Sequence, residues 1–270
     1  MPASLDQIIA TTRIKVAEAR RTADLRDLDR RAQAHTPRGF RRALEARSRS
    51  GIAIIAELKK ASPSRGLIRA NFDVESLAHE LEQAEAAALS VLTDQEFFQG
   101  SLGNLRCASS STQLPCLRKD FMVDEFQVLE ARANSADAVL LIAAALSQTE
   151  LISLAQAARQ LDLDVLCEVH DEQELSRAVD AGCDLIGVNS RDLRSFKVDL
   201  ATAFRLVDLI PRNAIRVAES GIQSGADIAR LRAAGYQAFL IGESLMKAES
   251  PGKALRTLLA EAAIPVSSSA

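Results

Sequence analysis

The chain carries eight short apolar runs, each followed by a segment with a helical pattern, and this repetition is the feature that most limits how it can fold. Successive runs begin 22 to 37 residues apart. Most of them are continuously apolar rather than alternating, as expected of parallel strands that are covered on both faces. The repetition predicts an α/β protein built as a closed (β/α)8 TIM barrel. The predicted strands begin near Ile52, Leu89, Pro115, Ala138, Leu163, Leu185, Ile215 and Ala238.

Residues typical of helix ends lie between the runs. Segment 147–150, with the sequence SQTE, is a capping box that predicts the start of a helix. Gly182 and Gly235 follow two other helical segments, where glycine supplies a left-handed turn at little steric cost. A further helix is expected over 74–88. An open, doubly wound sheet is the main alternative fold, but it would usually have a glycine-rich turn after its first strand, and segment 57–66 is not such a turn.

The pattern divides the chain into three parts. Residues 1–47 are helical and charged, and we expect them to form a helical extension that packs on one end of the barrel. Residues 48–264 contain all eight apolar runs and are expected to form the barrel itself. Residues 265–270 are expected to be a frayed tail.

Composition argues against several classes of partner. With 270 residues and a net charge of −3, the chain has no general attraction for nucleic acid or anionic lipid, so any anion site must be local. No stretch approaches the roughly 20 apolar residues of a membrane helix, and the N-terminal segment lacks the apolar core of a secretory signal. The four cysteines match no zinc or redox spacing, and buried free thiols fit a reducing, cytoplasmic location. The oligomeric state stays open between a monomer and a weak dimer.

Charged and amide side chains recur where the apolar runs end. Because residues that follow the strands of such a barrel face the same pocket, we expect these side chains to converge. Burying a charge is costly unless something pairs with it, so their repeated position indicates a site rather than packing. A lysine held among glutamates would be a cationic proton donor, and a glutamate beside it could accept or relay a proton. The candidates are Glu57, Lys59, Lys119, Glu168, Asn189 and Glu219.

Two glycine-containing segments predict an anion site. Segments 220–221 and 242–244 follow the last two runs, where such barrels commonly hold a phosphate with backbone N–H groups, and Arg191 could add a bidentate contact. Taken singly, each feature has an ordinary interpretation, because a strand-end glutamate is usually solvated and Ser-Gly is a common turn. Their joint presence favours acid–base chemistry on a phosphorylated small molecule. By contrast, Arg65 is expected to face solvent and His170 to have a structural role.

Seven motifs, taken in order along the chain, resemble those of indole-3-glycerol-phosphate synthase. Each motif is moderately specific alone, and together they are highly specific. They span about residues 50–262, and the N-terminal helical extension also fits that family. The motifs are IAELKKASPSRG (55–66), LSVLTDQEFFQG (89–100), LRKDFMVDEFQ (117–127), CEVH (167–170), GVNSRDL (187–193), AESGI (218–222) and LIGESLM (240–246).

The resemblance implies a carbon–carbon lyase of tryptophan biosynthesis that acts on a phosphorylated small molecule. In that reaction 1-(2-carboxyphenylamino)-1-deoxy-D-ribulose 5-phosphate closes to an indole ring with loss of CO2 and water, and no metal or organic cofactor is implied. By position, Lys119 resembles the general acid of ring closure. Lys59, paired with Glu57, resembles a substrate contact and a second acid for dehydration. Glu168 would stabilise the developing iminium cation or take a proton.

The same motifs imply the residues that would hold the substrate. Asn189 and Glu219 would orient the substrate and the lysines. The contacts at the phosphate end would come from Lys59, Ser62, Arg191, Ser220, Gly221, Gly242 and the backbone of Glu243. The aromatic ring would lie against Phe98, Phe121, Leu140, Leu193 and Ile222.

The residues alone leave two kinds of alternative open. One is another phosphate-binding barrel enzyme, such as a phosphoribosyl isomerase or a Schiff-base aldolase, and an aldolase would use a desolvated lysine as nucleophile. The other is a non-catalytic barrel that senses a phosphorylated metabolite. Such a sensor would keep the phosphate-binding residues but would have no need for the strand-end lysines and glutamates.

Overall fold

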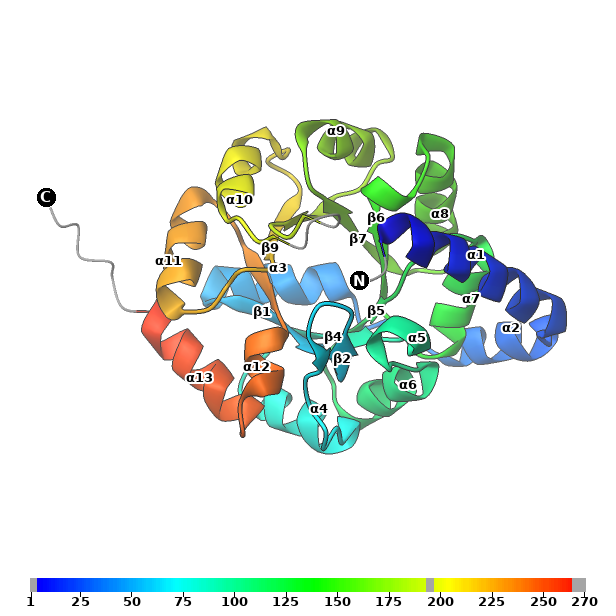
Figure 1. Cartoon of the computed structure of the whole chain (residues 1–270), viewed down its shortest axis with the longest axis horizontal. Helices are drawn as coiled ribbons and strands as arrows, with labels where there is room; N and C mark the ends of the chain where they lie inside the picture. The colour runs from blue at the N-terminus through cyan, green and yellow to red at the C-terminus, as the bar shows by residue number, and fades with distance from the viewer. Residues whose placement is uncertain (1–3, 193–196, 264–270) are drawn as a thin grey trace, which may run out of the picture.

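Eight parallel strands close into a barrel in the computed structural model, which describes residues 4–192 and 197–263. The order around the barrel is β1-β10-β9-β8-β7-β6-β5-β4, and the helices surround it (Figure 1). Each strand begins within one residue of the predicted position, so the predicted (β/α)8 barrel is confirmed. The strands are β1 (Ala53–Leu58), β4 (Ala88–Leu92), β5 (Cys116–Lys119), β6 (Ala138–Ile142), β7 (Asp164–Val169), β8 (Leu185–Asn189), β9 (Ile215–Glu219) and β10 (Ala238–Ile241).

Helices follow the strands and cover the outside of the barrel. They are α4 (Val74–Gln83), α5 (Gln95–Phe98), α6 (Leu102–Ser111), α7 (Glu125–Ala133), α8 (Gln148–Gln160), α9 (Glu172–Asp180), α10 (Ala201–Leu206), α11 (Gly225–Ala234), α12 (Glu243–Lys247) and α13 (Pro251–Ala262), with 3-10 turns η1 (Ala143–Ala145) and η2 (Val207–Leu209). The predicted capping box begins α8, and Gly235 ends α11 with φ 114°. The helix expected over 74–88 is shorter, because Glu85 adopts a left-handed φ of 66° just after α4.

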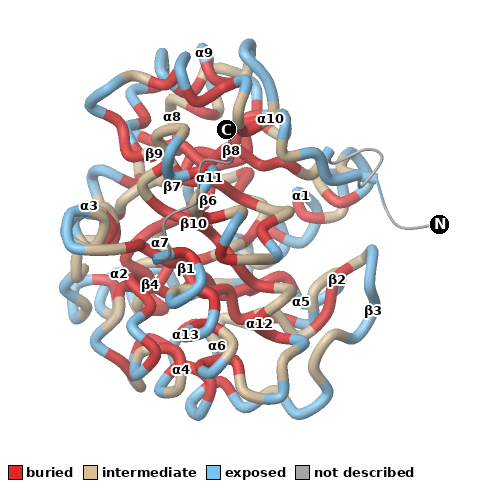
Figure 2. Tube along the Cα trace, turned by 90° about the vertical axis from the view of Figure 1, so that its left-hand side faces the viewer, coloured by how far each residue is buried: buried red, intermediate tan, exposed pale blue. Residues whose placement is uncertain are grey.

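Three helices precede the barrel: α1 (Leu5–Thr22), α2 (Leu25–Ala34) and α3 (Phe40–Ser50). The expected packing on one end of the barrel describes α3 alone. Phe40 and Leu44 of α3 are fully buried among the inward-facing side chains of the strands. Helix α2 packs on α7, and α1 extends toward the other end, where the hairpin β2–β3 (Ala61–Ser62 and Gly66–Leu67) lies (Figure 2). The predicted boundary at residue 47 falls inside α3, and the tail 265–270 lies outside the described residues.

A buried ionic cluster fastens the segment between α2 and α3 to the barrel. Asp137, which precedes β6, is fully buried. Its carboxylate accepts hydrogen bonds from Arg38 Nη2 at 2.6 Å and from the backbone N–H groups of Arg38 and Cys116, each at 2.7 Å. His35 Nε2 lies 3.2 Å away. Burial raises the pKa of Asp137, but the hydrogen bonds from His35 and Arg38 outweigh this effect and hold the pKa below its usual value.

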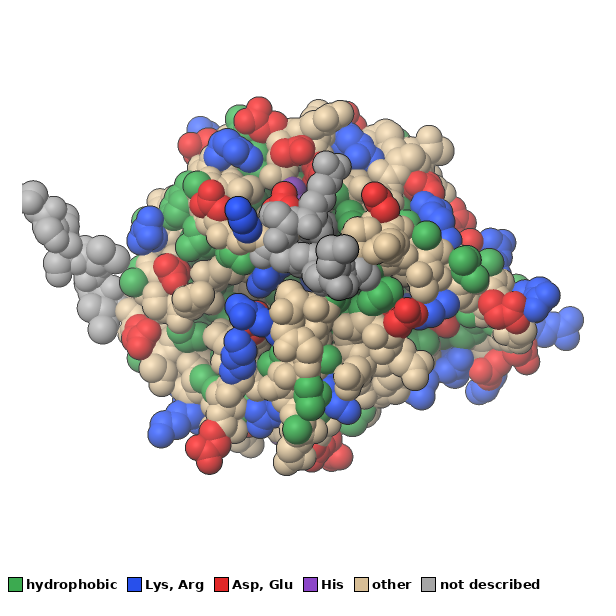
Figure 3. Space-filling model, viewed as in Figure 1, with side chains coloured by type: hydrophobic (Ala, Val, Ile, Leu, Met, Phe, Trp, Pro, Cys, Tyr) green, Lys and Arg blue, Asp and Glu red, His purple; other side chains and the backbone are tan. Residues whose placement is uncertain are grey.

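Apolar and charged side chains are separated as in an ordinary globular barrel. One apolar cluster lies inside the barrel and a larger one lies between the strands and the surrounding helices. Acidic and basic side chains are interspersed around the periphery of the face shown in Figure 3. Within the described ranges, none of the helices has the length and apolar character needed to cross a membrane.

Candidate active site

A pocket of about 720 Å³ lies at the carboxyl ends of the barrel strands. The structure brings together in it all the predicted site residues that it describes, whereas Leu193 lies outside the described residues. Their roles stay predictions. The predicted residues that line the pocket are Glu57, Lys59, Ser62, Phe98, Lys119, Phe121, Leu140, Glu168, Asn189, Arg191, Glu219, Ser220, Gly221, Ile222, Gly242 and Glu243.

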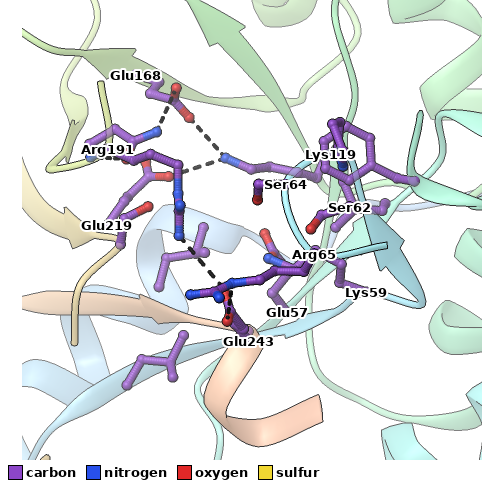
Figure 4. A pocket seen from close by; sticks show the side chains of 18 of the residues that line it. Glu57, Lys59, Ser62, Ser64, Arg65, Lys119, Glu168, Arg191, Glu219 and Glu243 are labelled. Carbon is purple, nitrogen blue, oxygen red and sulfur yellow. Dashed lines mark hydrogen bonds and ion pairs between the residues drawn. The ribbon is translucent and has the colours of Figure 1, made fainter. Parts of the chain in front are cut away.

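Lys119, the last residue of β5, is held by two glutamates (Figure 4). Its Nζ donates to Glu168 Oε2 at 2.9 Å and to Glu219 Oε2 at 3.1 Å. Burial disfavours the ammonium charge, but the attraction of the two carboxylates outweighs it and raises the pKa of Lys119. For Glu168, burial is likewise outweighed by the charge of Lys119, so its pKa is lowered. Lys119 is therefore a positioned, protonated ammonium that faces the pocket.

Asn189 fixes the other oxygen of Glu168. Its Nδ2 donates to Glu168 Oε1 at 3.0 Å, and its own Oδ1 accepts the backbone N–H of Arg191 at 2.9 Å. Because both ends of the amide have partners, Asn189 links the end of β8 to the carboxylate on β7. The neutral amide does this without changing the charge balance of the cluster.

Glu219 differs from Glu168 although both pair with Lys119. It is 1% exposed, and within the described residues its Oε1 has no hydrogen-bond partner. Burial is the main cause that raises the pKa of Glu219 to about 7, with the nearby Glu168 charge adding to it. The carboxyl group fits in the barrel only because β8 has a glycine opposite it: a Cβ at Gly187 would lie 2.0 Å from Glu219 Oε1.

This raised pKa makes Glu219→Gln a test of the electrostatics. The folded state binds the Glu219 proton more tightly than the unfolded state does. The free energy of unfolding therefore falls as pH rises from about 4.5, the ordinary pKa of a glutamate, through about 7. The glutamine variant lacks this cost, so we expect urea unfolding to show a gain on the order of 2 kcal/mol at pH 8.5 and little gain at pH 5, with reduced turnover. A gain in unfolding free energy that is the same at both pH values would contradict this interpretation.

Glu57 and Lys59 form a second ion pair at the end of β1. Lys59 Nζ lies 2.6 Å from Glu57 Oε1, and the Glu57 side chain is almost completely buried. Room for this carboxylate depends on Gly242 after β10, because a Cβ there would lie 2.4 Å from Glu57 Oε1. The pair places a second ammonium group in the pocket, next to the loop that is predicted to bind phosphate.

The loop after β9 has an unusual backbone. Ser220 and Gly221 both have positive φ, 62° and 78°. A side chain at Gly221 would be strained, and its Cβ would also lie 2.7 Å from Val198 Cγ1. Ser220 and Gly221 both line the pocket, which suits the predicted contact with an anion.

Glu243, at the start of α12, is surrounded by cations (Figure 4). Its carboxylate pairs with Arg65 Nε at 3.0 Å and Lys247 Nζ at 2.6 Å, and lies 3.7 Å from Arg191 Nη2. Arg65 keeps 55% of its side chain exposed, in line with the solvent-facing position predicted for it, yet it also lines the pocket. Sequence reasoning missed this cluster because the partners of long side chains depend on how three loops fold against each other.

Part of the pocket wall is apolar. The rings of Phe98 and Phe121 pack with centroids 6.2 Å apart and planes tilted by 43°. Leu5 and Ile8 of α1 also line the pocket, so the N-terminal extension contributes to the site. The sequence predicted a helical extension here, but none of its features indicated that the first helix would reach the mouth of the barrel.

His170, for which the sequence predicts a structural role, lies beside the site and contacts Glu168. Residues two positions apart in an extended chain return to the same side, and the ring of His170 turns back toward Glu168. Its Nε2 lies 3.4 Å from Glu168 Oε1, and its Nδ1 lies 3.0 Å from Glu174 Oε2 of α9. Burial lowers the pKa of His170, but its interactions with Glu168 and Glu174 outweigh this and raise it to about 10.

The closed parallel barrel and the charged pocket at its carboxyl end define a (β/α)8-barrel enzyme. The model of the indole-3-glycerol phosphate synthase family matches residues 5–258. The chain belongs to the indole-3-glycerol phosphate synthase family, whose members are carboxy-lyases of tryptophan biosynthesis. The family and activity predicted from the seven motifs are thereby confirmed.

Curated relatives and solved structures agree with this assignment. The chain is 58% identical over 259 residues to the indole-3-glycerol phosphate synthase of Koribacter versatilis (strain Ellin345), covering 96% of this chain and all of that protein. It is 47% identical over 252 residues to that of Burkholderia multivorans, covering 93% of this chain and 97% of that protein. A structure of 3-hexulose-6-phosphate synthase aligns with a TM-score of 0.63 at 14% identity over 78% of this chain and 99% of its own, which shows the fold alone.

Proposed function

We propose that this pocket closes the indole ring of 1-(2-carboxyphenylamino)-1-deoxy-D-ribulose 5-phosphate, with Lys119 as the general acid. The observation that carries the proposal is the position of its ammonium group, which two buried carboxylates hold charged at the pocket wall. Attack of the ring carbon on the ribulose carbonyl requires a proton on the carbonyl oxygen. A positioned acid of this kind contributes roughly 10²–10⁴-fold to the rate.

The later steps use the second ion pair and the glutamates. Loss of CO2 restores the aromatic ring and needs little beyond desolvation of the carboxylate. Water then leaves when Lys59, paired with Glu57 at 2.6 Å, protonates the hydroxyl group. Glu168 stabilises the iminium cation and takes the ring proton, while Asn189 and Glu219 orient the substrate and the lysines.

Charge and shape support the way the substrate is oriented. Its phosphate faces the cationic end of the pocket, and its aromatic ring faces the Phe98–Phe121 wall. The phosphate contacts are assigned to Lys59, Ser62, Arg191, Ser220, Gly221, Gly242 and the backbone N–H of Glu243. The ring contacts are assigned to Phe98, Phe121, Leu140 and Ile222, and Leu193 stays a prediction from the sequence.

The direct test is an indole-fluorescence assay with the carboxyphenylamino substrate. We expect the purified protein to form indole-3-glycerol phosphate and CO2 in equal amounts, without added metal or cofactor. A substrate analogue that lacks the phosphate is expected to bind much more weakly, because the cationic end of the pocket would then have no anion to pair with. Turnover that is indifferent to the phosphate would contradict the assigned orientation.

Borohydride trapping separates this reaction from Schiff-base chemistry. Lys119 and Lys59 are both paired with carboxylates, which disfavours the neutral amine that a nucleophilic lysine needs. We therefore expect no increase in protein mass after borohydride is added during turnover. A mass increase that maps to either lysine would support the aldolase alternative instead.

Cytoplasmic location and a monomeric or weakly dimeric state stay predictions from the sequence. The proposed substrate is a small phosphorylated molecule, and the proposed chemistry involves neither nucleic acid nor a membrane.

A further inference from the structure

The proposed reaction consumes a proton. The carbonyl oxygen takes up two protons before it leaves as water, and the ring carbon next to nitrogen returns one. The substrate carboxylate departs as CO2 and carries no proton with it. Each turnover therefore needs one net proton from outside the substrate, and Lys119 and Lys59 cannot both be restored by the proton that the ring releases.

A protonated imidazole lies directly behind the acid. Glu168 stands between Lys119 and His170: its Oε2 accepts from Lys119 Nζ at 2.9 Å, and its Oε1 lies 3.4 Å from His170 Nε2. The Nε2 atom is buried and makes no hydrogen bond within the described residues, and its ion pair with Glu168 places Oε1 3.4 Å away. Contacts of this kind commonly tighten when substrate is bound.

Glu174 holds the other side of the ring. Its Oε2 accepts both the backbone N–H of His170 at 2.8 Å and the ring Nδ1–H at 3.0 Å. The two carboxylates that face the ring, one from the end of β7 and one from α9, together favour the charged imidazolium. The His170 side chain keeps only 15% of its surface exposed, so its proton is shielded from bulk water.

We propose that His170 is a proton reserve that acts through Glu168 to recharge Lys119 while substrate fills the pocket. After Lys119 has protonated the carbonyl oxygen, its neutral amine is a stronger base than either Glu168 or His170. The Nε2 proton moves to Glu168 Oε1, and the neutral carboxyl group then turns so that the same O–H faces Lys119 and passes its proton to Nζ. His170 becomes neutral with its Nδ1–H still on Glu174, and after product leaves a proton from solvent returns to Nε2 through Lys119 and Glu168, which line the pocket.

The raised pKa of His170 agrees with this role. With a pKa of about 10, the imidazole is charged across the neutral range, so the reserve is loaded at the start of each turnover. The attraction of Lys119 is what keeps the pKa of Glu168 low, and that attraction vanishes once Lys119 is neutral. Glu168 can then accept the proton for the short time that the transfer needs.

The inference rests on the proposed function. Its test is a single turnover with enzyme in excess over substrate. Indole fluorescence reports product formation, and a pH indicator in weak buffer reports proton uptake from solvent. In the wild type we expect proton uptake from solvent to lag behind ring closure, because the reserve supplies the proton first. In His170→Gln, whose amide can still donate a hydrogen bond to Glu168 but cannot lose a proton, uptake is expected to coincide with product formation. Steady-state kcat should fall about tenfold, with KM changed less than twofold.

His79→Gln is the matched control, because His79 is an exposed histidine on α4, outside the residues that line the pocket. It is expected to keep the wild-type lag and kcat. Glu174→Gln is expected to shorten the lag, since it removes one of the two charges that hold the imidazolium. Thermal unfolding of each variant checks that the barrel is intact.

The outcomes separate the two proposals. A wild-type enzyme whose proton uptake keeps pace with ring closure would overturn the reserve, and so would a His170→Gln variant that keeps the lag. A slower variant with an unchanged lag would show that His170 only supports the structure. Failure of the wild type to make indole-3-glycerol phosphate would instead contradict the proposed function.

Discussion

Lys119→Ala is expected to lose nearly all turnover, by at least the 10²–10⁴-fold that a positioned general acid contributes. The substitution removes the proton donor and also leaves Glu168 and Glu219 facing each other without the cation between them. One of the two carboxyls should then bind a proton, because like charges at close range disfavour ionisation. The measurement is kcat in the indole-fluorescence assay, with enzyme concentration raised to reach the slow rate.

Lys119→Arg is the control that separates charge from proton transfer. Arginine keeps the positive charge between the glutamates but does not give up its proton at accessible pH. We expect this variant to fold normally and to stay nearly inactive. Retained turnover in Lys119→Ala would remove this residue from its assigned role, and full turnover in Lys119→Arg would reduce that role to electrostatics.

Asp137→Asn is expected to produce the largest loss of stability. The substitution leaves the Arg38 guanidinium, which is 21% exposed, without its fully buried carboxylate partner. Breaking a buried pair by removing one member typically costs about 3–5 kcal/mol, and urea unfolding at neutral pH would measure it. Activity per folded molecule should change little, because the cluster lies at the end of the barrel opposite the pocket.

The stability lost in Asp137→Asn is expected to depend on pH. The folded-state pKa of Asp137 lies below its ordinary value of 3.8, so the carboxylate contributes stability above about pH 4 that is lost as pH falls through the folded-state pKa. The difference in unfolding free energy between wild type and variant should therefore shrink in acid. Asp208→Asn, at an exposed aspartate, is the control and should show almost no difference at either pH. A gap that does not depend on pH would mean that the charge of Asp137 is not what stabilises the fold.

Patterns that depend on the local chain were predictable, whereas contacts between separate loops were not. The apolar runs together with their spacing located the eight strands of the barrel, because a strand covered on both faces has little freedom in its composition. The alternation of strand and helix then placed Lys119 and Glu168 in one pocket without any knowledge of their distance. The predicted end of the helix over 74–88 was wrong. The sequence gives little sign that Glu85 would take the left-handed conformation that glycine usually adopts.

The missed parts of the site have a common physical origin. The pairing of Arg65 with Glu243 joins a loop and a helix that are far apart in the chain, and a long side chain can reach several partners. For His170 the sequence predicted a structural role but not the contact with Glu168, because a ring at the end of a strand is free to turn back. Leu5 reaches the pocket through the path of a whole helix, which hydrophobic periodicity does not specify.

The two side chains with which α3 closes one end of the barrel limit how the chain could be shortened or rearranged. Phe40 and Leu44 fill the floor beneath the inner strand layer, so a fragment trimmed to start at β1 would expose that floor to water. Shortened or circularly permuted versions would have to retain this helix or supply an equally bulky replacement from another part of the chain. The segment that precedes the first strand is thus part of the foundation of the barrel rather than a removable appendage.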